Sequence, residues 1–244
     1  MGKLYVAGIG PGNENGMTIR VKRVLEECPV IVGYKTYIDL VKPIIGSDKE
    51  YIDTGMRRET ERCRIALEKA SGPDAKVCMI CSGDASVYGM AGLVLEMAAD
   101  HPEVNVEVIP GVTAALSGSA VLGAAVGHDC AIISLSDLLT PPSVIEKRVK
   151  AAAEGDFVIC LYNPGSKTRT EHLKDACRII LKYRSADTVC GLVRNIGRDG
   201  ESHEIMTLDK LAELKADMFT TVFIGNSQTK AVNGRMITPR GYEL

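Results

Sequence analysis

The chain has 244 residues, of which 45% are hydrophobic and 25% are charged, with a formal net charge of −2. This composition is that of an ordinary globular protein, and the small charge argues against a general nucleic-acid binder, which is usually basic. No apolar run approaches the roughly 20 residues of a membrane-spanning helix. The first ten residues lack the layout of a signal peptide, so we expect a cytoplasmic location.

Apolar strands alternate with amphipathic helices in the first half of the chain. The predicted strands lie at residues 3–9, 30–33, 50–55, 76–82 and 104–109. The predicted helices lie at residues 18–28, 34–45, 59–70 and 90–101. This alternation is typical of an α/β fold.

The loop GIGPGN, residues 8–13, follows the first strand and invites comparison with the dinucleotide fingerprint G-x-G-x-x-G. Position 13, where the third glycine would stand, is Asn13. Pro11 also removes a backbone N–H from a loop that would have to hold a pyrophosphate. The loop therefore allows close passage of the backbone but does not predict a nicotinamide cofactor.

The stretch ICSGDASVYG, residues 80–89, combines a strand end, a Gly-Asp turn and a helix start. Ligands of open α/β sheets bind outside the carboxyl ends of the strands, so this turn is a candidate ligand site. Gly83 lets the backbone approach a ligand closely, and Asp84 either caps the following helix or accepts a ligand donor. A simple capped turn explains the same ten residues equally well.

The eight cysteines are scattered, and most fall in apolar runs, so we expect small buried side chains in a reducing compartment. The one close pair is Cys78 and Cys81, within a predicted strand. Residues three apart in a strand point to opposite faces, which is a poor geometry for a shared metal ion. We therefore expect no metal site at this pair.

We place a domain boundary between residues 112 and 113, where an uncharged run of small residues predicts a tightly packed helix. The predicted strands beyond it lie at residues 130–136, 157–162, 188–195, 203–207 and 220–225. The predicted helices lie at residues 141–153, 168–184 and 208–215, and residues 231–244 show little periodicity. A late strand-turn-strand pattern favours a mixed sheet in this second α/β domain.

Four turn motifs occur in order: GIGPG, SGDASVYG, IPGVTAA and LYNPGSK. Together they resemble the tetrapyrrole methylases, which use S-adenosylmethionine, and the resemblance covers essentially the whole chain. It implies two α/β domains with a ligand cleft between them, usually in a homodimer. Many family members have proline after the aspartate of the second motif, where this chain has Ala85.

Longer stretches, including FVICLYNPGSKTR and GLVRNIGRDGE, are similar to the family members that methylate carbon-17 of a corrin precursor and contract its ring in cobalamin biosynthesis. By position in the motifs, the resemblance implies that S-adenosylmethionine contacts Pro11, Ser82, Gly83, Asp84, Val87, Thr113, Ala114, Tyr162, Asn163, Asn195 and Ile196. The substrate carries many carboxylates, and cationic or polar residues near predicted loops are expected to bind them. These candidates are Arg57, Arg58, Ser134, Ser136, Lys167, Arg169, Arg194 and Arg198.

Methyl transfer from a sulfonium depends on alignment, whereas ring contraction also moves protons. His128 and Asp129 are the catalytic candidates for that second step, although capping roles beside a strand explain both residues too. Each cation taken alone is also explained as a solvated surface charge. Four alternatives stay open: an enzyme that methylates another ring carbon, a non-catalytic tetrapyrrole carrier, a nicotinamide oxidoreductase and a metal-binding module at Cys78 and Cys81. The motifs do not decide whether the substrate holds cobalt.

Overall fold

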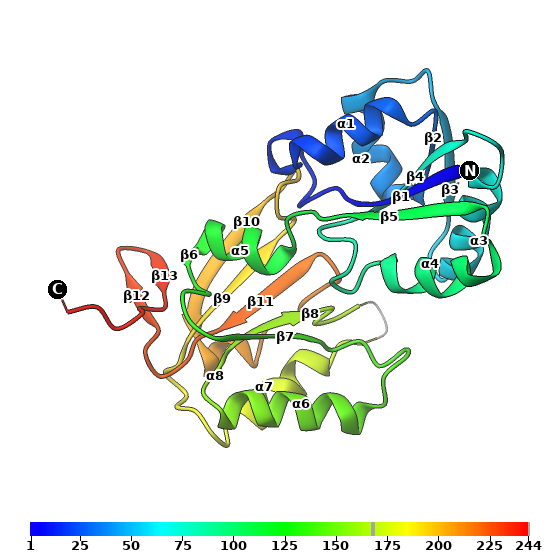
Figure 1. Cartoon of the computed structure of the whole chain (residues 1–244). Helices are drawn as coiled ribbons and strands as arrows, with labels where there is room; N and C mark the ends of the chain where they lie inside the picture. Colours follow the sequence, from blue (N-terminus) through cyan, green and yellow to red (C-terminus); the bar gives the residue numbers. More distant parts are fainter. Residues whose placement is uncertain (167–168, 244) are drawn as a thin grey trace. The chain divides into compact units, whose positions relative to one another are not determined.

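The computed structural model describes residues 1–166 and 169–243, and it divides into two compact units, Met1–Thr113 and Ala114–Leu244 (Figure 1). This division falls one residue after the position expected from the sequence. Each unit has its own five-stranded sheet. Within the described ranges, no helix combines the length and the apolar content needed to cross a membrane.

The first unit contains a sheet of order β3-β2-β4-β1-β5, in which every neighbouring pair is parallel. Its strands are β1 (Gly2–Gly8), β2 (Val30–Tyr34), β3 (Glu50–Thr54), β4 (Lys76–Cys81) and β5 (Val104–Ile109). Its helices are α1 (Ile19–Glu27), α2 (Lys35–Ile45), α3 (Glu59–Ala70) and α4 (Ala91–Met97), with the 3-10 turns η1 (Glu14–Gly16) and η2 (Ala98–Asp100). The strands and helices predicted for this half are confirmed, with small shifts at their ends.

Helices cover both faces of this sheet, which explains why its strands are apolar on both sides. α1 and α2 share one core with Ile31 and Cys78, whereas α3 and α4 share the other with Leu4 and Cys81. Cys78 and Cys81 therefore point to opposite faces, as their spacing predicts. The chain leaves β1 for α1 on one face and β4 for α4 on the other. The neighbours β1 and β4 thus form the switch point of the sheet, where such folds bind ligands.

The second unit contains a sheet of order β10-β9-β11-β8-β7. β7 and β8 are parallel and the other pairs are antiparallel, so the predicted mixed sheet is confirmed. The strands of the unit are β6 (Gly123–Ala124), β7 (Cys130–Ser134), β8 (Val158–Tyr162), β9 (Val189–Arg194), β10 (Ser202–Thr207), β11 (Thr220–Ile224), β12 (Lys230–Val232) and β13 (Arg235–Ile237). Its helices are α5 (Ala114–Leu122), α6 (Pro142–Glu154), α7 (His172–Ile180) and α8 (Leu208–Leu211).

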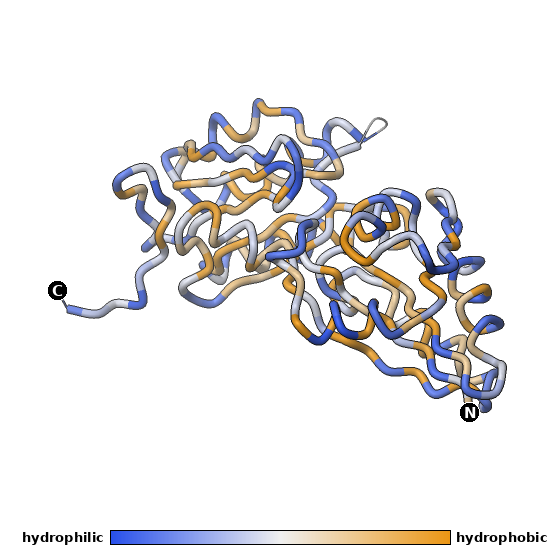
Figure 2. Tube along the Cα trace, turned by 90° about the horizontal axis from the view of Figure 1, so that it is seen from above, coloured by the Kyte–Doolittle hydropathy of each residue, from blue (hydrophilic) through white to orange (hydrophobic). Residues whose placement is uncertain are grey.

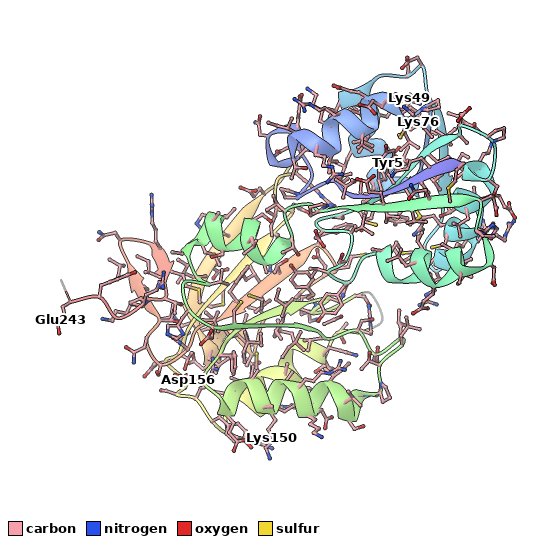
Figure 3. All side chains as sticks on the ribbon, viewed as in Figure 1. Tyr5, Lys49, Lys76, Lys150, Asp156 and Glu243 are labelled. Atoms are coloured by element: carbon pink, nitrogen blue, oxygen red, sulfur yellow. The ribbon has the colours of Figure 1, made fainter. Side chains whose placement is uncertain are left out.

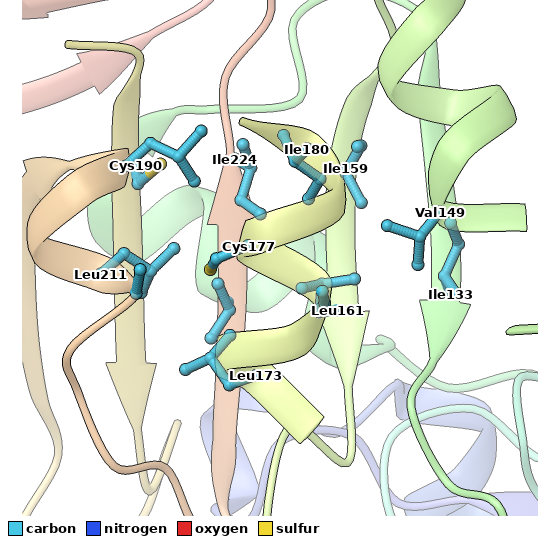
Figure 4. Packing of buried hydrophobic residues seen from close by; sticks show 14 of the residues in the cluster. Ile133, Val149, Ile159, Leu161, Leu173, Cys177, Ile180, Cys190, Leu211 and Ile224 are labelled. Carbon is cyan, nitrogen blue, oxygen red and sulfur yellow. The ribbon is translucent and has the colours of Figure 1, made fainter. Parts of the chain in front are cut away.

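Two cores hold this second sheet between its helices. α6, α7 and α8 cover one face, where Leu161, Cys177 and Ile224 pack together (Figure 4). α5 covers the other face and packs against Phe223. A Cβ on Gly118 of α5 would lie 2.8 Å from Cζ of Phe223, so glycine lets this helix approach the sheet closely.

The end of the chain contains structure that the sequence pattern does not indicate. Residues 231–244 show little periodicity, yet β12 and β13 form a hairpin, and β13 also pairs with β6. Asn233 and Gly234 both have positive φ, of 49° and 72°, which is the conformation of a tight hairpin turn. All three residues of β12 are exposed, so this strand lacks the alternation of buried and exposed residues that indicates a strand in a sequence. The tail beyond β13 is mostly hydrophilic (Figure 2).

Two helices of the second unit are shorter than predicted. α7 covers His172–Ile180 of the predicted residues 168–184, and α8 covers Leu208–Leu211 of the predicted residues 208–215. In both cases the chain continues as turns, although the apolar spacing extends further. Element ends are the part of a pattern that tertiary packing most readily overrides.

Candidate functional site

Three glycine-containing loops meet at the carboxyl edge of the first sheet, after β1, β4 and β5. Gly10 and Gly83 exchange two backbone hydrogen bonds, with N···O distances of 3.0 and 2.8 Å. A Cβ on Gly111 would overlap the carbonyl oxygens of both Gly8 and Gly83, so only glycine allows this contact. We call Gly8, Gly10, Gly83, Asp84 and Gly111 the loop junction.

Asp84 connects two of these loops through both oxygens of its carboxylate. Its Oδ1 accepts the backbone N–H of Ser86 at 2.8 Å and that of Val87 at 3.2 Å. Its Oδ2 accepts the backbone N–H of Gly111 at 2.9 Å. Asp84 therefore stabilises the turn before α4 rather than capping that helix, whose N-cap is Met90. Its role toward a ligand stays a prediction. The role of Gly111 is one that the sequence analysis missed, although each of the three glycine turns directly follows a strand.

The hydrogen bonds of the loop junction limit what it can bind. The amides of Gly10 and Gly83 pair with each other, that of Gly111 binds Asp84, and Pro11 has none. A pyrophosphate held at a strand-to-helix turn needs several backbone N–H groups directed at it. The geometry therefore disfavours a dinucleotide and leaves small side chains and turn carbonyls, which suit an adenosine with an amino-acid tail.

A second group of predicted residues meets at the carboxyl edge of the second sheet. The parallel register of β7 and β8 pairs Ser134 with Tyr162. Asn163 directly follows β8, and its Nδ2 donates to Oγ of Ser134 over 2.9 Å. The hydroxyl of Tyr162 accepts the N–H of Ala115 at 2.6 Å, in the first turn of α5. This places Ser134, Tyr162 and Asn163 in one group with the helix start that contains Ala114 and follows the buried Thr113.

Asn163 and Asn195 share an unusual backbone conformation, with φ of 52° and 50°. Asparagine is enriched in this left-handed region, and such strained positions cluster at functional sites. Asn195 follows β9, which runs in the direction of β8 because β11 lies antiparallel between them. The two asparagines therefore leave the same edge of the sheet. Ile196, which comes next, instead packs in the core beneath α5.

A polar network extends beyond β7 from Ser136. Nη1 of Arg169 donates to Oγ of Ser136 over 2.7 Å and lies 3.7 Å from Oδ1 of Asp137. Nε2 of His172 lies 3.1 Å from Oδ2 of Asp137. The hydrogen bond with His172 lowers the pKa of the Asp137 carboxyl, and the charges of His172 and Arg169 add to this effect. His172 is not among the site residues expected from the sequence, because it lies inside a predicted helix.

The remaining predicted cations occupy separate positions. Arg57 and Arg58 are exposed in the loop between β3 and α3, at the carboxyl edge of the first sheet, and Arg58 pairs with Glu61. Arg194 is the last residue of β9. The guanidinium of Arg198 lies 5.7 Å from the centroid of the Phe219 ring. Lys167 lies outside the described residues.

His128 and Asp129 lie at the opposite edge of the second sheet. The carbonyl of Asp129 accepts the N–H of Val158 at the start of β8, and Asp156, labelled in Figure 3, precedes the same end of that strand. Ser134 is about five residues further along β7, or roughly 16 Å away. Nδ1 of His128 lies 3.6 Å from Oδ2 of Asp129, and both side chains are exposed. The structure does not bring this pair to the Ser134 edge, and its catalytic role stays a prediction.

The chain is similar to one protein-family model, to two relatives and to one solved structure. The family model Tetrapyrrole (Corrin/Porphyrin) Methylases matches residues 3–212. The probable cobalt-factor III C(17)-methyltransferase of Salmonella typhimurium is 48% identical over 242 residues, which cover 99% of this chain and 100% of the relative. The cobalamin biosynthesis protein CbiHC of Archaeoglobus fulgidus is also 48% identical over 242 residues, and this chain spans 53% of that relative. The crystal structure of the methyltransferase CobJ matches with a TM-score of 0.89 at 33% identity, covering 98% of this chain and 100% of that one.

Proposed function

The chain belongs to the tetrapyrrole methylases, and from this premise we propose that it transfers a methyl group from S-adenosylmethionine to carbon-17 of a corrin precursor and contracts the ring. The precursor is cobalt-factor III or precorrin-3B, and the reaction belongs to cobalamin biosynthesis. The observation that carries this proposal is the 48% identity to a relative named as a C(17)-methyltransferase, over the full length of that relative.

The methyl donor is proposed to bind at the switch point of the first sheet, beside the loop junction. Pro11, Ser82 and Val87 belong to the loops that emerge there, together with Gly83 and Asp84. As the carbon–sulfur bond breaks, a carbon–carbon bond forms and S-adenosylhomocysteine leaves, so these residues have to align the reactants and exclude water rather than take a proton. The proposed set is completed by Thr113, Ala114, Tyr162, Asn163, Asn195 and Ile196.

The acid side arms of the substrate are proposed to meet cationic and hydroxyl side chains at the strand ends. Arg169 is the best-oriented candidate, because Ser136 and Asp137 both hold its guanidinium. A guanidinium fixed in this way can bind a carboxylate through two parallel hydrogen bonds. Arg57, Arg58, Ser134, Lys167, Arg194 and Arg198 remain further candidates for the same role.

Incubation with S-adenosylmethionine and each precursor separately tests the proposed reaction. We expect one of the two precursors to give a product that is heavier by one methyl group and has the spectrum of a contracted ring. A methylated product without contraction would assign the chain to a sibling activity at another carbon. Calorimetry that shows tetrapyrrole binding but no S-adenosylhomocysteine binding would assign a carrier instead.

The assembly and location implied by the resemblance are also proposals. We propose a homodimer, and light scattering should then give a mass of twice the 26.2 kDa of the chain. A mass equal to that of one chain would contradict the dimer and leave the proposed reaction untouched. A cytoplasmic location, where a diffusible precursor and the donor are both present, is tested by cell fractionation.

A further inference from the structure

Arg62 is a buried cation that the predicted site does not include. It lies in the first turn of α3, and only 5% of its surface is exposed. Its Nε donates to Oγ1 of Thr54 over 2.7 Å, and its Nη2 donates to the carbonyl of Gly55 over 3.0 Å. Its Cζ lies 5.9 Å from the centroid of the Tyr34 ring. All three partners are neutral.

The guanidinium of Arg62 has no carboxylate partner within 4.0 Å among residues 1–166 and 169–243. Its neighbours differ in this respect, because Arg58 pairs with Glu61 and Arg64 pairs with Glu68. Charged side chains are almost never buried without a partner of opposite charge, since an unpaired buried charge loses its hydration. Arg62 is therefore a buried cation that lacks an anion.

Part of the hydrogen-bonding capacity of Arg62 is unused. A guanidinium has five N–H donors in a planar fork, and Thr54 and Gly55 each take one. Among the described residues, the side-chain nitrogen that is fully buried without a hydrogen bond is Nε of Arg184, and no nitrogen of Arg62 is in that state. Nη1 of Arg62, which has no hydrogen-bond partner among the described residues, is not fully buried and therefore keeps some access to solvent. The planar arrangement of the remaining N–H groups matches the two oxygens of a carboxylate.

The position of Arg62 places it on the ligand-binding edge of the first sheet. Thr54 and Tyr34 are the last residues of β3 and β2, and they are paired in the parallel register. The same edge carries the loop junction, because all five strands run in one direction. β3 lies two strands from β4, a separation of roughly 10 Å. A tetrapyrrole ring with its peripheral acid arms spans such a distance.

We propose that Arg62, held by Thr54 and faced by Tyr34, is a carboxylate subsite that takes one peripheral acid arm of the tetrapyrrole substrate. This inference rests on the proposed function for the identity of the ligand. The incoming carboxylate supplies the anion that the buried guanidinium lacks, and it binds the N–H groups that Thr54 and Gly55 leave unused. The Tyr34 ring lies beside the same guanidinium and limits its movement.

Variants at position 62 test the subsite through the KM for the precursor and the Kd for uroporphyrin, a tetrapyrrole octacarboxylate used as a fluorescent probe. Arg62→Met keeps an unbranched apolar stem and removes the charge and the planar fork. We expect both constants to rise about 10- to 100-fold, the range for a lost charge-assisted hydrogen bond. In Arg62→Lys, which keeps the charge but loses the planar fork of N–H groups, both constants should rise less. The Kd for S-adenosylhomocysteine should stay within about twofold of its original value.

Arg64→Met is the matched control, because Arg64 lies on the same helix but is exposed and paired with Glu68. It should leave all three constants unchanged. If Arg62→Met does not fold, Thr54→Val removes the hydroxyl that orients Arg62 and should raise the uroporphyrin Kd several-fold. Unchanged precursor and uroporphyrin constants in a folded Arg62 variant overturn the subsite while the proposed reaction stands. A second outcome separates the two proposals in the opposite direction. If Arg62→Met weakens uroporphyrin binding but the wild-type protein methylates neither precursor, the subsite is supported and the proposed reaction is overturned.

Discussion

Burial controls the reactivity of the cysteine side chains. Seven of the eight are buried, and Cys130 is exposed. Burial raises the pKa of the Cys28, Cys63 and Cys81 thiols to about 11 and that of Cys177 to about 12. The thiolate is the nucleophilic form of cysteine, so these buried thiols are both protonated and shielded near neutral pH.

Thiol labelling at pH 8 should therefore distinguish Cys130 from the rest. We expect a disulfide reagent such as Ellman's to modify about one thiol per native chain, and all eight after unfolding in urea. The Cys130→Ser variant should lose the native reaction and keep seven thiols in urea. Rapid native reaction of two or more thiols would show that the buried cysteines are more accessible than the structure indicates.

Asp137 gives the protein a pH-dependent contribution to stability. Its folded pKa is lowered, chiefly by the hydrogen bond with His172. A lowered folded pKa means that the contribution is complete above the ordinary value of about 3.9 and is lost as the pH falls through the folded value. We expect Asp137→Asn to be less stable than the wild type at pH 7, with the difference shrinking toward pH 3. Urea unfolding at a series of pH values measures this difference.

Asp100→Asn is a suitable control for that series, because Asp100 is exposed and forms no ion pair within the described ranges. Its effect on the free energy of unfolding should be small at every pH. A destabilisation by Asp137→Asn that stays constant down to pH 3 would mean that packing, rather than charge, accounts for it.

At the scale of elements, the sequence predicts what repeats and misses what depends on distant contacts. The strands and helices of the first unit follow from apolar spacing, because packing and local preference agree there. The bond between Asp84 and Gly111 could not be predicted from the sequence, since the two residues are 27 positions apart. His172 lies inside a predicted helix, and its partner Asp137 lies 35 residues earlier in the loop after β7, so the sequence pattern does not connect the two.

The loop junction makes a sharp prediction about glycine. In Gly111→Ala the new Cβ would overlap two backbone carbonyl oxygens, those of Gly8 and Gly83. Relief of this overlap has to move a loop, at a cost of roughly 1–3 kcal/mol in the free energy of unfolding. We expect S-adenosylhomocysteine binding, measured by calorimetry, to weaken by at least about tenfold.

Gly92→Ala is the matched control for this substitution. Gly92 lies in α4, where a Cβ would meet nothing within 4 Å. Gly92 lies in the first turn of α4, and alanine there should raise the free energy of unfolding by at most about 1 kcal/mol and leave ligand binding unchanged. Normal ligand affinity in Gly111→Ala would show that the loop junction is not part of the donor site.

At the scale of the whole molecule, the two units explain how far the sequence analysis could reach. Each unit has its own cores on both faces of its sheet, so the alternation of strands and helices could be interpreted separately in each half. The hairpin of β12 and β13 has a local signal, the Asn233-Gly234 turn, which the apolar spacing alone does not reveal. The pairing of β13 with β6, about 110 residues earlier in the chain, could not be predicted. Pairings between segments so far apart leave no periodic signal in the sequence.

Binding of S-adenosylhomocysteine should stabilise the folded chain through mass action. At a free concentration of 100 times its Kd, a ligand specific for the native state adds about 2.7 kcal/mol. For a protein of this size each kcal/mol raises the melting temperature by roughly 2–4 °C, so a shift of about 5–11 °C is expected in a thermal scan. NADH at the same concentration should give no shift, because the amides of Gly10 and Gly83 already bind each other. A melting-temperature shift with NADH and none with S-adenosylhomocysteine would restore the dinucleotide hypothesis. Loss of the S-adenosylhomocysteine shift in the Gly111→Ala variant would support a donor site at the loop junction.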